Sequence, residues 1–133
     1  GQSFALKDAL TRGRLEVKDL DHVNATGHAS EIADQNEASA IQNVLGDCPV
    51  VAPSSYFGTL SAASSAVQLL TSLVAAEQGV RPATLNYTTP DEHCPVRVST
   101  EVEAIQNPAF VKLASTHTGQ TAAMAIRLEN QCR

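Results

Sequence analysis

The chain has 133 residues and a formal net charge of −5, with 43% hydrophobic and 17% charged residues. This length and composition suit one globular domain with a real core, and they exclude an intrinsically disordered chain. Lys and Arg form no cluster anywhere in the sequence, so the positive surface that binds a phosphate backbone is missing. Nucleic acid is therefore not an expected partner.

Cysteine and histidine spacing argues against a disulfide framework and against a metal site. The number of cysteines is odd with no CxxC pair, and the histidines form no HExxH-type pair of ligands. These residues are Cys48, Cys94, Cys132, His22, His28, His93 and His117. We expect no metal, no cofactor and a reducing, cytoplasmic setting.

The first third of the chain predicts a helix, a strand, a tight turn and a second helix. The first helix is expected to end near Gly13, because glycine favours a helix stop. The segment "LDHVNA" then alternates as a strand does and stops at the small-residue turn 25–30. Helical periodicity begins at Glu31 and is closed by Gly46. A turn in this place is suited to presenting a reactive side chain.

The remaining segments predict more strands and one long helix. The run "PVVAP" is consistent with a buried parallel strand, and a helix is predicted from Leu60 to Gln78. The segments "VRVST", "FVKLAST" and "TAAMAIRL" are predicted strands, the last two an antiparallel pair around Thr118 and Gly119. The order predicts an α/β layer structure with a mixed sheet.

The run from Cys48 to Ala76 has no charged residue, so we considered whether it could be a membrane-spanning segment. It contains Pro49, Pro53, Gly58 and several serines, so it is not a continuous apolar span. We expect instead a buried helix, small on one face and packed inside a larger body, and no membrane partner.

The turn and the helix after it form the first of several motifs that resemble a known family. In "VNATGHASEIADQNE", Thr26 and Gly27 stand where that family has a His-Gly pair after a strand. Asp34 and Glu37 fall in register with an Asp and a Glu of the family's following helix.

Further motifs follow in the same order over nearly the whole chain. In "PSSYFGTLSAASSAV", Ser54, Gly58 and Thr59 stand at the lysine, glycine and histidine of a Lys-Ser…Gly-His motif before a small-residue helix. "GVRPATLNYTTPDEHC" matches a Thr-Leu-Asn…Pro-Asp segment, and His117 and Gly119 fall at a phenylalanine and a glycine of a closing loop. Together these segments resemble the C-terminal half of the β-ketoacyl synthases (3-oxoacyl-[acyl-carrier-protein] synthases), the condensing enzymes of fatty-acid and polyketide synthesis.

The resemblance implies a thiolase-like fold, in which two related α/β halves form a five-layered body. Residues 1–133 are then expected to be the C-terminal half-domain, with a mixed sheet and a central buried helix. The half that holds the nucleophilic cysteine is expected to lie outside this chain, either upstream or on a partner chain.

The residues at the family's catalytic positions are degenerate. Condensation in that family uses two histidines, because imidazole donates a strong hydrogen bond and titrates near neutral pH. Here Thr26 and Thr59 stand at those positions, and Ser54 stands at the lysine. A neutral hydroxyl supplies neither a charge nor a base at pH 7. Loss of one such donor typically costs about 10²–10³ in rate, so this chain alone is expected to be inactive.

Two histidines are candidate substitutes for the lost groups. His28 lies two residues beyond Thr26, and such a displacement usually ruins the reacting geometry, so a solvated turn histidine is the expected alternative. His117 either points into the former acyl site or is an ordinary loop histidine.

The carboxylates and thiols have structural interpretations as well. Asp34 and Glu37 lie one helical turn apart and are expected to cap and solvate their helix rather than to form an acid/base pair. Cys48 is expected to be a small buried hydrophobe. The neighbours His93 and Cys94 are a weak catalytic signal, because adjacent side chains rarely face one another.

The sequence predicts a non-catalytic or strongly impaired ketosynthase-like domain that acts as a partner or structural subunit. The alternative is an acyl-thioester transferase or condensing enzyme with altered chemistry, using a cysteine of the missing half with His28 or His117. A third interpretation is a structural half-domain without a ligand. The expected partners are the N-terminal ketosynthase half or an active ketosynthase subunit, and, more weakly, an acyl carrier protein or an acyl chain.

Overall fold

The computed structural model describes residues 1–129, and Cys132 lies outside that range. The main sheet has the strand order β2-β1-β5-β6. Its strands are β1 (Leu20–Asn24), β2 (Val50–Val51), β5 (Ala109–Ser115) and β6 (Thr121–Arg127). β1 runs parallel to β2 and to β5, and β5 pairs with β6 as an antiparallel hairpin. The predicted mixed sheet and terminal hairpin are confirmed.

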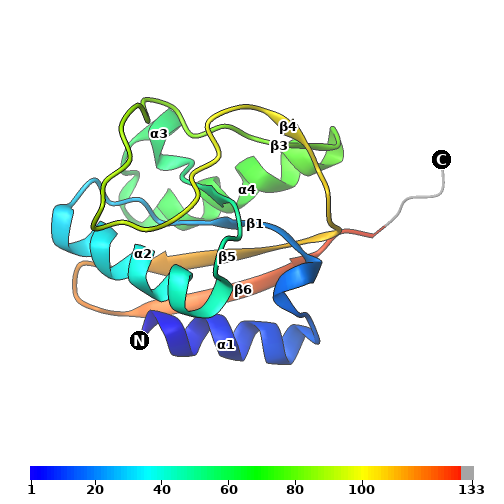
Figure 1. Ribbon diagram of the computed structural model, residues 1–133, viewed down its shortest axis with the longest axis horizontal. Coiled ribbons are helices and arrows are strands. Elements are labelled where there is room, and N and C mark those ends of the chain that lie inside the picture. The colour runs from blue at the N-terminus through cyan, green and yellow to red at the C-terminus, as the bar shows by residue number, and fades with distance from the viewer. Residues whose placement is uncertain (130–133) are drawn as a thin grey trace.

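Helices cover both faces of this sheet (Figure 1). α1 (Gln2–Gly13) and α2 (Glu31–Leu45) pack together on one face, and α4 (Ser64–Glu77) lies on the other. The predicted end of the first helix at Gly13 and the stop at Gly46 agree with the structure. The α/β layer structure is therefore confirmed.

Short elements connect these layers. They are the 3₁₀ turns η1 (Val17–Asp19) and η2 (Ser61–Ala63), the short helix α3 (Ser54–Phe57), and a second sheet of β3 (Val80–Arg81) and β4 (Glu103–Ala104). The prediction of a strand at 96–100 is largely wrong, because this segment pairs with the sheet only through a single parallel bridge between Val98 and Val50. At the next residue, the Ser99 carbonyl accepts the N–H of Thr84 and the Ser99 hydroxyl accepts Arg81 Nε, so its hydrogen bonds go to the segment 81–84.

The face of the sheet toward α1 and α2 carries the apolar core. Successive side chains of a strand point to opposite faces, so alternate residues of β1 and β5 share this side. The core includes Leu6, Leu10, Leu20, Val23, Ile41, Leu45, Val111 and Leu113. This packing fixes β1 and α2 on either side of the turn 25–30.

The face toward α4 carries buried polar side chains beside Phe110, whose ring stacks on that of His22 with the centroids 5.0 Å apart. Ser72 Oγ lies 2.8 Å from His22 Nε2, and Asn24 Nδ2 donates to Ser72 Oγ at 2.8 Å and to the Gln68 carbonyl at 2.7 Å. The buried residues of α4 are Gln68 and Ser72, whereas large apolar residues on its outer side are more than half exposed. In this chain the apolar side of α4 therefore faces away from the sheet.

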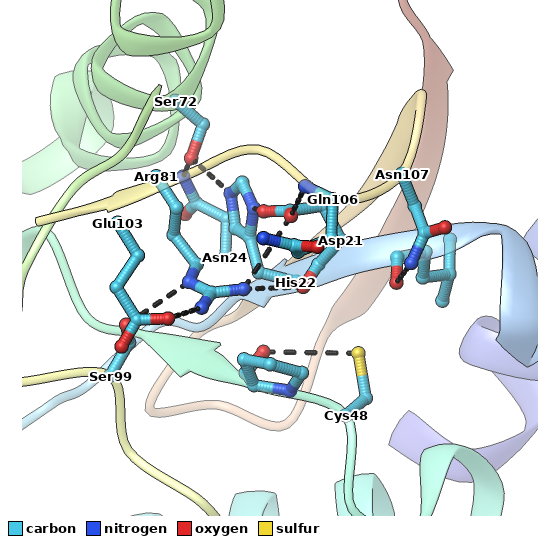
Figure 2. Close-up of polar contacts among 12 residues, drawn as sticks. Asp21, His22, Asn24, Cys48, Ser72, Arg81, Ser99, Glu103, Gln106 and Asn107 are labelled. Carbon is cyan, nitrogen blue, oxygen red and sulfur yellow. Dashed lines mark hydrogen bonds and ion pairs between the residues drawn. The ribbon is translucent and has the colours of Figure 1, made fainter. Parts of the chain in front are cut away.

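A buried charge network anchors the start of β1 (Figure 2). Asp21 Oδ2 lies 2.8 Å from His22 Nδ1, and Asp21 Oδ1 accepts the Gln106 N–H at 2.8 Å and lies 3.5 Å from Arg81 Nη1. Arg81 Nη2 lies 2.6 Å from Glu103 Oε2. Burial raises the pKa of Asp21, but the hydrogen bonds from His22 and Gln106 and the charge of Arg81 hold it below its usual value. The network ties β1 to β3 and β4.

Candidate functional site

The turn after β1 borders a cavity of about 310 Å³ at the end of the sheet. Thr26, Thr59, His28 and His117 all line it, although they come from segments far apart in the sequence. Ser54 does not line this cavity and instead lies behind the turn, where its hydroxyl donates to the Gly27 carbonyl at 2.8 Å. The structure thus brings together four of the five residues singled out from the sequence.

Thr26 is held by hydrogen bonds from three sides. Its N–H donates to Glu37 Oε1 at 2.7 Å, and its carbonyl accepts Gln68 Nε2 at 3.1 Å. Its hydroxyl donates to the Leu113 carbonyl at 3.1 Å. A hydroxyl has one hydrogen, so that of Thr26 is committed to the protein and only its lone pairs remain for a ligand.

Glu37 and Asp34 hold the turn, and the expectation that Glu37 is solvated is wrong. Glu37 is 4% exposed and accepts the N–H groups of Thr26 and Gly27 at 2.7 and 3.0 Å. Asp34 Oδ1 accepts the N–H of His28 at 3.0 Å. A carboxylate that accepts backbone N–H groups forms strong, charge-assisted hydrogen bonds. The frame of the turn therefore depends on these two carboxylates.

The two candidate histidines are neighbours in space. The rings of His28 and His117 lie 4.7 Å apart between centroids and are tilted by 40°. His28 Nε2 lies 3.0 Å from the Ser115 carbonyl, which only accepts, so Nε2 carries a hydrogen. The expectation that His28 is simply solvated is wrong, because the side chain is half-buried and hydrogen-bonded. His117 is exposed at the cavity.

A buried lysine lies behind the cavity, and sequence reasoning missed it. Lys112 of β5 is 4% exposed, and its ammonium donates to Gln68 Oε1 at 2.7 Å and to the Leu113 carbonyl at 2.8 Å. Burial lowers the pKa of Lys112 to about 8, and the charge of Glu37 acts in the opposite direction. Its position inside the apolar segment "AFVKLA" could have revealed it, because a charge in a buried strand is costly unless other groups pair with it or hydrogen-bond to it.

The thiols contribute no nucleophile to this cavity within the described chain. Cys48 is buried as expected, and burial raises the pKa of its thiol to about 12. Burial also raises the pKa of Cys94, whose Sγ lies 3.9 Å from Asp91 Oδ2. His93 Nε2 lies 3.6 Å from Glu92 Oε1, so Cys94 and His93 each have a separate carboxylate neighbour.

Two further findings concern metals and membranes. Within residues 1–129, His, Cys, Asp and Glu form no group of three or more that could hold a metal ion. The helices of that range are all too short or too polar to cross a membrane.

The fold and the turn geometry define the C-terminal half of a thiolase-like condensing-enzyme fold. The family model of the β-ketoacyl synthase C-terminal domain matches residues 1–88. The chain therefore belongs to the β-ketoacyl synthase family.

Relatives and solved structures agree with this assignment. Nodulation protein E of Rhizobium leguminosarum bv. trifolii is 30% identical over 131 residues, which is 96% of this chain and 33% of that protein. A putative polyketide beta-ketoacyl synthase 1 of Streptomyces cyaneus is 33% identical over 94 residues, 68% of this chain and 22% of that protein. The solved ishigamide ketosynthase/chain length factor superposes with a TM-score of 0.91 at 26% identity, over 98% of this chain and 33% of that one. The chain spans about a third of the length of nodulation protein E.

Proposed function

We propose that residues 1–133 form the C-terminal domain of a ketosynthase-like protein that does not perform condensation. In this proposal the domain serves as the partner of an active ketosynthase subunit in polyketide or fatty-acid chain elongation. Its role is to complete the assembly and to shape the cavity that holds the growing acyl chain.

The observation that carries this proposal is the hydrogen bond from the Thr26 hydroxyl to the Leu113 carbonyl. An oxyanion site needs a donor that points at the developing charge, and this hydrogen points into the protein. Thr59 adds a second neutral hydroxyl and no base. His28 and His117 are the only titratable side chains that line the cavity among residues 1–129. The family's two histidine positions, Thr26 and Thr59, therefore hold no acid–base group here, and the imidazoles of the cavity wall stand at other positions.

The outer side of α4 supports a partner that covers it. A groove of about 470 Å³ runs along this side and is lined by Tyr56, Phe57, Leu70, Val74 and Pro82, among others. Large exposed apolar patches mark interaction surfaces. We assign this groove to the N-terminal ketosynthase half, because the chain spans only a third or less of the relatives that it matches.

The names of two solved structures fit a partner role. One is a ketosynthase/chain length factor, and another is a type II acyl-carrier protein in complex with its ketosynthase. By analogy, the assembled protein contacts an acyl carrier protein or an acyl chain. A reducing, cytoplasmic setting belongs to the same proposal.

The test is a thioester-transfer and malonyl-decarboxylation assay on the natural gene product that contains this chain. We expect no turnover by that protein alone, and a change in product length or yield when it is added to an active ketosynthase subunit. Turnover by the protein alone contradicts the proposal.

A second function is favoured by the contact between His28 and His117 beside the cavity. In this alternative the histidine pair assists a cysteine of the missing half in altered acyl transfer. The test applies His28→Gln and His117→Gln separately to any turnover that the natural protein shows, with the exposed His93→Gln as the matched control. The alternative predicts loss of turnover in the first two variants and no change in the third.

A purely structural half-domain is the remaining interpretation. A ligand that binds only the folded state stabilises it by an amount that grows with the logarithm of its concentration relative to its Kd. A rise in Tm with acyl chains of increasing length contradicts a structural role without a ligand, whereas an unchanged Tm supports it.

A further inference from the structure

Lys112 carries a buried charge that no carboxylate contacts directly among residues 1–129. All the acceptors of its ammonium are neutral: Gln68 Oε1 at 2.7 Å, and the carbonyls of Leu113, Ala25 and Asn24 at 2.8, 3.3 and 3.4 Å. Buried charges are normally paired, because leaving water costs several kcal/mol per ion. The position of the ammonium therefore needs a compensating charge elsewhere.

Glu37 supplies that charge through a single peptide group. Lys112 Nζ donates to the Ala25 carbonyl at 3.3 Å, and the Thr26 N–H donates to Glu37 Oε1 at 2.7 Å. This C=O and this N–H belong to the same planar peptide unit. The peptide dipole therefore lies between a cation at its oxygen and a carboxylate at its hydrogen, which fixes its orientation.

Lys112 also acts on Thr26 by a second route, through Gln68. Its ammonium binds Gln68 Oε1, which leaves Gln68 Nε2 to donate to the Thr26 carbonyl at 3.1 Å. The Leu113 carbonyl accepts both the ammonium and the Thr26 hydroxyl. The lysine thus sets the orientation of the groups that hold the polar atoms of Thr26.

We propose that Lys112, through its ammonium on β5, is the positioning residue for the turn 25–30. The hydroxyl of Ser54 supports the same turn by donating to the Gly27 carbonyl at 2.8 Å, but it carries no charge. This inference rests on the proposed function only in assuming that the cavity beside the turn holds an acyl chain; the positioning of the turn by Lys112 does not depend on that assumption.

The test compares Lys112→Met with the exposed control Lys7→Met in the 133-residue chain. The readout is the pair of amide proton signals of Thr26 and Gly27, which report their hydrogen bonds to Glu37. We expect both signals to move upfield in Lys112→Met and to stay in place in Lys7→Met. Unchanged signals in folded Lys112→Met overturn the positioning role.

If Lys112→Met does not fold, the same question is answered by following the amide proton signal of Thr26 in the unmodified chain as the pH is raised. The groups that face the ammonium are Gln68 from α4 and backbone carbonyls of β1, of the turn after it and of β5, all neutral, with Glu37 of α2 acting across the peptide. We expect the Thr26 amide signal to follow the titration of the ammonium, with a lower midpoint in Glu37→Gln. A Thr26 signal that ignores this titration overturns the proposal. These readouts need no enzymatic activity, so a failure of the proposed function is distinguished from a failure of this inference.

Discussion

Thr26 donates its only hydroxyl hydrogen to the backbone carbonyl of Leu113, at 3.1 Å. The bond joins the turn after β1 to the neighbouring strand β5. The side chain at the family's histidine position therefore has a structural contact with the sheet. A histidine at the same place presents ring nitrogens that donate and accept. The same backbone frame therefore supports either a catalytic group or a structural one, and the side chain at position 26 decides which.

The buried carboxylate of Glu37 is predicted to be essential for the turn. Glu37→Ala leaves the N–H groups of Thr26 and Gly27 without an acceptor, and hydrogen bonds to charged groups contribute about 1.5–3 kcal/mol each. We expect a loss of at least ~2 kcal/mol in the free energy of unfolding, measured by urea denaturation. The matched control is Glu31→Ala, an exposed residue at the start of the same helix, which should change it by less than ~0.5 kcal/mol. Equal effects of the two changes contradict this role.

Gly27 is predicted to tolerate no side chain. Its φ is +58°, and an added Cβ comes within 2.7 Å of Ser54 Oγ and 3.1 Å of Ala52 Cβ. Gly79 also has a positive φ, +74°, but open space around it, so Gly79→Ala tests a positive-φ glycine without a side-chain clash. We expect Gly27→Ala to lower Tm more than Gly79→Ala does. If the two variants melt together, the packing of Ser54 against the turn is not tight.

Lys112 is predicted to make the folded state more stable as pH rises above neutrality. Its pKa in the folded chain is about 8, below the ordinary value of 10.5. Below pH 8 both states hold the proton, whereas between 8 and 10.5 the unfolded chain still holds a proton that the folded chain has lost. The free energy of unfolding of the unmodified chain, minus that of Lys112→Met, should therefore rise by on the order of 3 kcal/mol across this range. Subtracting the variant removes the contribution of other groups such as Cys48, and a flat difference contradicts the assignment.

The outer side of α4 is predicted to cause self-association of the isolated chain. Leu70 and Val74 are 55% and 58% exposed on this side. We expect Leu70→Lys together with Val74→Lys to shift sedimentation toward the monomer. Met124→Lys on β6, where the side chain is 55% exposed, is the control for adding a charge elsewhere. A monodisperse monomer of the unmodified chain rules out this prediction.

Sequence patterns predicted the elements well where local chemistry decides them. Gly13 and Gly46 mark helix ends, and two strand-like segments on either side of Thr118 and Gly119 predicted the hairpin of β5 and β6. These features depend on neighbours along the chain, so a single sequence contains the information.

Sequence patterns failed where long-range contacts decide the outcome. A Glu one helical turn from an Asp usually faces water. Glu37 is buried instead, because the fold places the turn after β1 beside α2, where the N–H groups of Thr26 and Gly27 donate to its carboxylate. A lysine in a strand is typical of a solvated face, and Lys112 is buried because Gln68 of α4 lies above it. The spacing of α4 predicted its apolar residues, but only the fold shows that its polar side contacts the sheet.

The most direct test of the account is to return histidine to both threonine positions in the natural gene product. Malonyl-thioester decarboxylation is measured for that protein and for the Thr26→His/Thr59→His variant, with circular dichroism to check folding. The account predicts no turnover by the natural protein and detectable turnover by the double variant, because the frame held by Glu37 and Asp34 then presents imidazoles to the cavity. Turnover by the natural protein contradicts it, and makes His28 and His117 the next residues to test.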